Sequence, residues 1–220
     1  MIRRLGMALA APALILALSG CVSVFPKSKP DQLYSFGLGG SGDAPPAGPA
    51  KDAVGVLLAV VDFPRSSTGD GILTVTGTQN AYVGESRWVG PASVLFREAV
   101  GRAFDRQSQR SRLLARGETG RDELILRLDV RDFEALYPNG PGSTPTVAVS
   151  FRARLSRPDG TAVDEKTFDS RKQAGDNRVG PIVAAFDAAT GETLKGLVAW
   201  TDQTAAALPP TPAVGARRPN

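Results

Sequence analysis

Few residue types in this chain could do chemistry. It contains a single cysteine, Cys21, and no histidine. The lack of histidine excludes Ser-His-Asp and Cys-His catalysis, histidine acid–base relays and histidine metal ligands. One cysteine cannot form an internal disulfide or a cysteine-rich zinc site. The sequence therefore predicts no enzyme activity, no metal and no cofactor, and it leaves the Cys21 thiol as the group of interest.

Cys21 follows a segment with the pattern of an export signal. Arg3 and Arg4 precede an uncharged, apolar stretch over residues 5–18. That stretch has the length of a signal-peptide core and is too short to span a bilayer, which takes about 20 apolar residues. A signal peptide is therefore expected over residues 1–20. The alternative is a buried core helix, which Pro12 disfavours.

The four residues that end at Cys21, Leu-Ser-Gly-Cys, resemble the lipobox of bacterial lipoproteins. The resemblance implies that the Cys21 thiol receives a diacylglycerol, that the signal is cut before it and that the new amine is acylated. Several acyl chains give a stable anchor, since each buried methylene contributes about 0.8 kcal/mol. Val22 and Ser23 stand where inner-membrane lipoproteins typically carry an acidic residue. The resemblance thus implies an outer-membrane anchor with the body facing the periplasm.

Tyr82, Arg87 and Trp88 form an aromatic and basic cluster directly before a predicted helix. These residue types are enriched at interfaces, so the three are candidate partner contacts. The alternative, which we favour for Trp88, is a core residue that packs against the start of the helix. A second tryptophan, Trp200, is expected in the core or at a subunit contact rather than as a platform for a ligand.

Two charged segments allow both a functional and a structural interpretation. Asp129, Arg131 and Asp132 could form an ion pair or a paired-carboxylate site. A solvated strand face is favoured, because no nucleophile or metal-ligand set accompanies them. The arginine-rich residues 106–116 could contact phospholipid headgroups. A solvated helix end and loop is the favoured interpretation there.

The composition predicts one globular domain with tails. The chain has 220 residues, of which 42% are hydrophobic and 22% charged, as is typical of a single domain. Its formal charge of +4 falls when the basic signal is removed, so nucleic acid is not an expected partner. We expect a lipidated tether with a short strand and a Gly/Pro-rich linker over 21–53. An α/β domain over 54–207 and a disordered tail over 208–220 should follow.

Periodicity predicts the elements of that domain. Apolar residues at helical spacing indicate one helix that begins at Pro91 and a second over 181–207, which Gly191 could interrupt. The apolar run 54–63 is expected as a strand in the middle of a covered sheet. Strand 123–136 changes its alternation near Asp132, which suggests a bulge or bend. Further strands are expected over 33–36, 72–76, 80–83, 146–157 and 162–171. The predicted fold class is α/β, with a mixed sheet flanked by two main helices in a single compact domain behind the tether.

Several motifs follow one another in a recognisable order from Cys21 to about Asp202. They are the lipobox cysteine, the strand Leu33-Tyr34-Ser35-Phe36, a buried strand that ends before Pro64, Tyr82 and Arg87-Trp88 ahead of a helix from Pro91, and a last helix with the late Trp200. This order resembles that of the ABC-type transport auxiliary lipoproteins, the PqiC-like family.

The resemblance implies a non-catalytic auxiliary subunit of an MCE-type ABC lipid transport system at the outer membrane. The implied partners are an MCE-domain protein, an ABC permease and its ATPase, with the lipid anchor in the membrane. A homo-oligomer is left open. The main alternative is an independent periplasmic lipid-binding or envelope-structural lipoprotein. An envelope hydrolase is a further alternative, although the sequence groups no serine, aspartate or glutamate residues for it.

Overall fold

The computed structural model describes residues 30–38, 50, 52–115, 117–118 and 124–208. Contacts divide the chain into two units, residues 1–30 and 31–220, and every helix and strand described lies in the second unit. The predicted signal peptide, the lipidation site Cys21 and most of the Gly/Pro-rich linker lie outside the described residues. So does the predicted tail, except for its first residue, Leu208.

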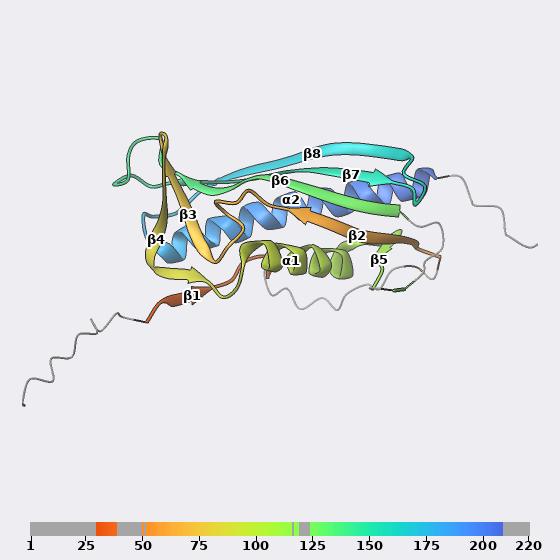
Figure 1. Cartoon of the computed structure of the whole chain (residues 1–220), viewed down its shortest axis with the longest axis horizontal. Helices are drawn as coiled ribbons and strands as arrows, with labels where there is room; N and C mark the ends of the chain where they lie inside the picture. The colour runs from red at the N-terminus through yellow and green to blue at the C-terminus, as the bar shows by residue number, and fades with distance from the viewer. Residues whose placement is uncertain (1–29, 39–49, 51, 116, 119–123, 209–220) are drawn as a thin grey trace, which may run out of the picture. The chain divides into compact units, whose positions relative to one another are not determined.

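The described elements form one mixed sheet with two helices. Strand β6 is the central strand of the sheet. One edge of β6 pairs with β7 along its length, and β7 pairs in turn with β8. The other edge of β6 is shared, because β2 pairs in parallel with its first half and β3 with its end. Beyond β3 the sheet continues through β4 to β1, and beyond β2 it ends in β5 (Figure 1). The bounds are β1 Gln32–Tyr34, β2 Val54–Asp62, β3 Gly71–Thr76, β4 Gln79–Trp88, α1 Ala92–Gln107, β5 Ser111–Leu113, β6 Leu124–Leu136, β7 Thr146–Ser156, β8 Ala162–Gln173 and α2 Val179–Ala207. The predicted fold class is confirmed.

Both helices cover the same face of the sheet and enclose the core. The ring of Phe133 on β6 lies 4.9 Å from Phe186 of α2 and 6.2 Å from Phe96 of α1. Phe36, just after β1, lies 4.8 Å from Phe133 as well. Burying such side chains contributes roughly 1.5–3 kcal/mol each. The apolar stripe predicted for α1 is the buried face of that helix: Ala92, Leu95, Phe96, Ala99, Val100, Ala103 and Phe104.

The phase change predicted in strand 123–136 is confirmed. The pairing of β6 with β7 shifts register between Val130 and Asp132, so Arg131 is the extra residue of a bulge. Residues before the bulge and after it can then both present their apolar side chains to the helices. Val130 and Phe133 are accordingly both buried.

The structure decides one point about the elements that was left open and corrects one prediction. Helix α2 runs without a break through Gly191, because packing along one whole side outweighs the low helix propensity of glycine. Strand β2 is not in the middle of a covered sheet. It pairs with β5 only over Val54–Val56, and Leu57 is exposed on the face that no described helix covers.

Helix α2 approaches the sheet closely at Gly196. A Cβ at this position would lie 3.1 Å from Cδ1 of Phe168 on β8. One turn further along, Trp200 packs against Phe168 at 5.8 Å. Its indole Nε1 donates a hydrogen bond of 2.7 Å to Asp164 Oδ2. Trp200 is therefore a core residue that ties α2 to the edge strand β8.

Candidate functional site

The candidate contact residues Tyr82, Arg87 and Trp88 lie on β4, which bends sharply between them (Figure 1). The first part of β4 pairs with β3 up to Tyr82, opposite Leu73, and the pairing resumes with Gly71 opposite Arg87. The second part of β4 also pairs in parallel with β1. Glu85 lies in the irregular stretch and has a φ of 52°. It is the one non-glycine residue with a positive φ in the described part of the chain.

Of the three candidate residues, Trp88 is buried, whereas Tyr82 and Arg87 are exposed. Trp88 is 2% exposed, and its ring packs edge-on against Phe36 at 4.9 Å and Phe186 at 5.3 Å. Its neighbour Arg87 points to the opposite face, as strand alternation requires. The Arg87 side chain is 48% exposed, and Tyr82 is 57% exposed. Only Tyr82 and Arg87 are thus available at the surface.

Arg87 ties the start of the domain to the loop before β3. Its guanidinium forms ion pairs with Asp31, directly before β1, and with Asp70 at 3.2 Å. The pKa of Arg87 lies above its ordinary value, mainly because of the charge of Asp31, with Asp70 adding to it. Both acceptors are partly exposed, so each pair stabilises the fold only modestly. Their main effect is to hold the guanidinium in one place.

Tyr82 is held by two contacts with the same loop. Its hydroxyl donates a hydrogen bond of 2.9 Å to the carbonyl oxygen of Ser66. Its ring lies directly over Gly71, where a Cβ would come within 2.5 Å of Tyr82 Cδ1. Glycine at position 71 therefore allows the ring to lie flat against the strand. Tyr82 and Arg87 both line an open depression of about 420 Å³, together with Asp31, Arg65, Asp70 and Glu85.

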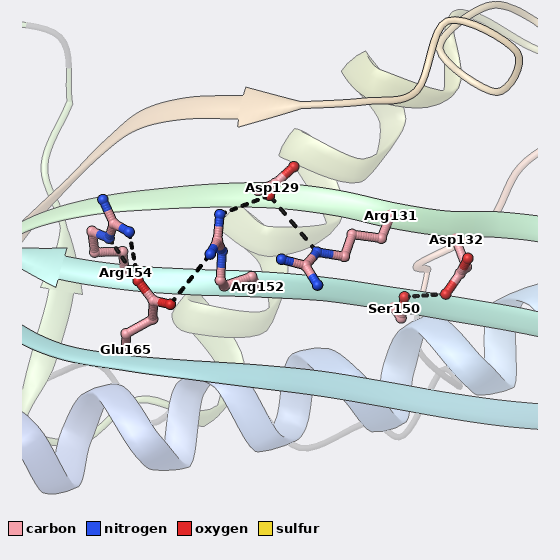
Figure 2. Close-up of polar contacts among 7 residues, drawn as sticks. All are labelled: Asp129, Arg131, Asp132, Ser150, Arg152, Arg154 and Glu165. Carbon is pink, nitrogen blue, oxygen red and sulfur yellow. Dashed lines mark hydrogen bonds and ion pairs between the residues drawn. The ribbon is translucent and has the colours of Figure 1, made fainter.

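A second group of charged residues lies on the uncovered face of the sheet (Figure 2). Asp129 forms ion pairs with Arg152 at 3.3 Å and with Arg131 at 3.8 Å. Glu165 on β8 pairs with Arg154 at 2.7 Å and with Arg152 at 3.5 Å. Asp129 and Arg131 thus form the solvated ion pair that the sequence analysis allowed. Exposed pairs of this kind contribute up to about 1 kcal/mol each.

Asp132 does not share a site with Asp129. Its carboxylate accepts a hydrogen bond from the Ser150 hydroxyl on β7, beyond the bulge (Figure 2). The arginines stand between Asp129 and Glu165, so each of these two carboxylates faces a guanidinium rather than another carboxylate. The paired-carboxylate interpretation is wrong, because strand pairing gives each acid a partner of its own.

The arginine-rich residues 106–116 cover the end of α1, β5 and the loop that follows. Arg106 donates a hydrogen bond of 2.6 Å to the carbonyl oxygen of Leu38. Arg112 pairs with Glu118 at 2.5 Å, and the pKa of Glu118 lies below its ordinary value, mainly because its carboxylate accepts the backbone N–H of Ala115. Arg106 and Arg112 therefore have partners within the domain, as a helix end and loop would provide, while Arg116 lies outside the described residues.

One polar cluster was not predicted from the sequence. The carboxylate of Asp202, on α2, accepts hydrogen bonds from the hydroxyls of Ser108 at 2.7 Å and Ser111 at 2.6 Å. It also accepts the backbone N–H groups of Gln109 at 2.8 Å and Arg110 at 3.3 Å. Burial alone would raise the pKa of Asp202, but these donors outweigh it and the pKa lies below its ordinary value. These hydrogen bonds make the cluster a clamp that joins the end of α1 and β5 to α2.

The described residues provide no other constellation for chemistry. No group of three or more acidic or cysteine side chains that could hold a metal ion occurs among them. None of their helices is long and apolar enough to cross a membrane. The described residues form a two-layer α/β domain, with one mixed sheet and two helices.

Comparison with known proteins identifies the family. The family model described as ABC-type transport auxiliary lipoprotein component matches residues 36–197, and the chain belongs to this family. A crystal structure of a protein from Xanthomonas campestris is similar at 21% identity and a TM-score of 0.62, covering 80% of this chain and 94% of that one.

A crystal structure of an uncharacterised protein is similar at 15% identity and a TM-score of 0.60. The match covers 79% of this chain and 99% of that one. Comparison with curated proteins gives no match. At these identities the two structures show the same fold, and they carry no information about partners.

Proposed function

We propose that the protein is a lipid-anchored, non-catalytic auxiliary subunit of an MCE-type ABC lipid transport system at the outer membrane. The family match over residues 36–197 carries this proposal. It is supported by the lipobox-like Leu-Ser-Gly-Cys21 in front of the matched region.

In this proposal Cys21 holds the protein in the membrane and the domain from Asp31 onward contacts the transport machinery or the membrane. Val22 and Ser23 after the cysteine favour the outer membrane over the inner one. The partners are an MCE-domain protein, an ABC permease and an ATPase. Tyr82 and Arg87 are the exposed members of the predicted contact set, and Trp88 supports them from the core.

The proposal is tested by replacing Cys21 in the full-length chain. Cys21→Ala should abolish acylation, move the protein out of the outer-membrane fraction and stop lipid transport. The domain should still fold, because Cys21 lies outside it. A Ser28→Ala variant, which keeps the thiol and the two residues after it, is the matched control and should behave like the unchanged protein. Full transport by the unacylated protein would contradict the anchoring role.

A further inference from the structure

The bend of β4 carries a surface that combines exposed apolar residues with charges of both signs. Leu33 of β1 lies beside Arg87 in the strand register and is 59% exposed. Val89 follows Arg87 by two residues and is exposed on the same face. Gly71 lies on the other side of Arg87, and the ring of Tyr82 packs directly over it. These contacts make Leu33, Val89, Arg87 and Tyr82 one continuous patch, here called the β4 patch.

The depression beside the β4 patch contains one uncommitted cation and one uncommitted anion. The guanidinium of Arg87 already pairs with two carboxylates, those of Asp31 and Asp70, which leaves this group with one net negative charge. Arg65 and Glu85 line the same depression. Neither side chain forms an ion pair or hydrogen bond within the described part of the chain. A ligand that carries a negative and a positive group would satisfy both.

The backbone conformation of Glu85 also indicates a binding site. A positive φ favours glycine, because a Cβ crowds the backbone there. The chain nevertheless has glutamate at this position, with its carboxylate at the rim of the depression. Side chains held in unfavourable backbone conformations are concentrated at binding sites. Among the described residues the carboxylate of Glu85 has no hydrogen bond or ion pair that would explain the strain through folding.

The length of the chain limits how far this surface can lie from the proposed anchor. Asp31, which binds Arg87, follows Cys21 by ten residues. A fully extended chain of that length spans at most about 36 Å. A tether this short keeps the β4 patch at a high local concentration near the bilayer surface, so even a weak contact is populated.

We infer that the β4 patch binds the bilayer surface and recognises phosphoethanolamine headgroups. The phosphate binds Arg65, and the primary ammonium donates hydrogen bonds to Glu85. Tyr82 lies at the level of the headgroups, where amphipathic rings are favoured, and Leu33 and Val89 reach the acyl boundary. This inference rests on the proposed function, because it takes the anchor at Cys21 as given. To the proposed function it adds a partner for Tyr82 and Arg87, the phospholipid headgroup, and the groups that recognise this headgroup.

The inference is tested with the full-length acylated protein reconstituted in vesicles. A photo-crosslinking phenylalanine analogue replaces Leu33, and a control protein carries it at Thr167 on β8, at the opposite edge of the sheet. Vesicles contain phosphatidylcholine alone, or with one quarter of phosphatidylethanolamine or phosphatidylglycerol. Mass spectrometry measures the yield of phospholipid adducts. We expect a yield at position 33 about threefold higher with phosphatidylethanolamine than with the other two, as exposed charge pairs produce, and little adduct at position 167.

Two variants separate recognition from folding. Glu85→Asn removes the carboxylate while tolerating the positive φ, and should abolish the preference for phosphatidylethanolamine. Arg65→Gln should lower the yield with all three lipids, whereas the matched control Arg171→Gln on β8 should not change it. Any of three results would overturn the inference. Two are equal yields with the three lipids and equal yields at the two positions. The third is found by crosslinking the same protein in native envelopes: adducts with proteins but none with phospholipid. The intact mass of each sample reports acylation of Cys21, so a failed anchor is distinguished from a failed headgroup contact.

Discussion

Replacing Asp202 should weaken the domain, because this carboxylate clamps the end of α1 to α2. It accepts hydrogen bonds from two hydroxyls and two backbone N–H groups. Hydrogen bonds to a charged group contribute roughly 1.5–3 kcal/mol each and are not additive when they share one acceptor. Ser108 and Ser111 are buried and lie 2.9 Å apart, so they recover part of the loss by pairing with each other. We expect Asp202→Ala to lower the free energy of unfolding by about 3 kcal/mol.

The assay is thermal unfolding followed by circular dichroism. A loss of this size should lower the melting temperature by roughly 6–12 °C in a domain of this length. Asp169→Asn, at an exposed position of β8 without a partner among the described residues, is the matched control and should change the melting temperature little.

The pH dependence gives a second and sharper readout. Because the pKa of Asp202 is lower in the folded protein than its ordinary value, its contribution is fully present above about pH 4. It is lost progressively as the pH falls through the folded pKa. Asp202→Ala should therefore differ most from the unchanged protein near neutral pH and less in acid. A variant as stable as the unchanged protein, or a difference that does not shrink in acid, would refute the clamp.

Four further substitutions test other parts of the fold by chemical denaturation. Phe133→Ala should lower the free energy of unfolding by about 4 kcal/mol, since Phe133 lies at the centre of the aromatic core; a loss below half that value would contradict its central place. Glu85→Gly should raise it by up to about 1 kcal/mol by relieving the positive φ, and a clear loss would show that Glu85 supports the fold. Gly191→Ala should stabilise α2 by up to about 1 kcal/mol, because nothing lies within 4 Å of the added Cβ. Gly196→Ala should gain less, since its Cβ would crowd Phe168; equal gains would refute the close approach.

The parts of the fold that depend on local periodicity could be predicted from the sequence. The stripe of α1 recurs at helical spacing, and all seven of its predicted residues are buried. The bulge in β6 is visible as a change of phase near Asp132, because one extra residue reverses the faces of a strand. β8 lies at the edge of the sheet, as the many polar residues in its sequence indicate. Each of these signals lies within one element and needs no knowledge of its neighbours.

The parts that depend on distant partners could not be predicted. β5 has three residues, and only its pairing with β2 makes it a strand. Leu57 is exposed because it lies on the face of β2 that the helices do not cover. The clamp joins Ser108 to Asp202, which lie far apart in the chain, and neither residue belongs to a motif. The depression beside Tyr82 depends on the bend at Glu85, where a glutamate gives no sign of a positive φ.

The most direct test of the central claim is to identify what the protein contacts in its own envelope. The full-length acylated protein would be crosslinked in place, purified under denaturing conditions and analysed by mass spectrometry, with Cys21→Ala as the control. The account predicts recovery of an MCE-domain protein together with an ABC permease and its ATPase, and their loss in the control. Recovery of the acylated protein without any of these partners would contradict the auxiliary role and favour an independent lipid-binding or envelope-structural lipoprotein.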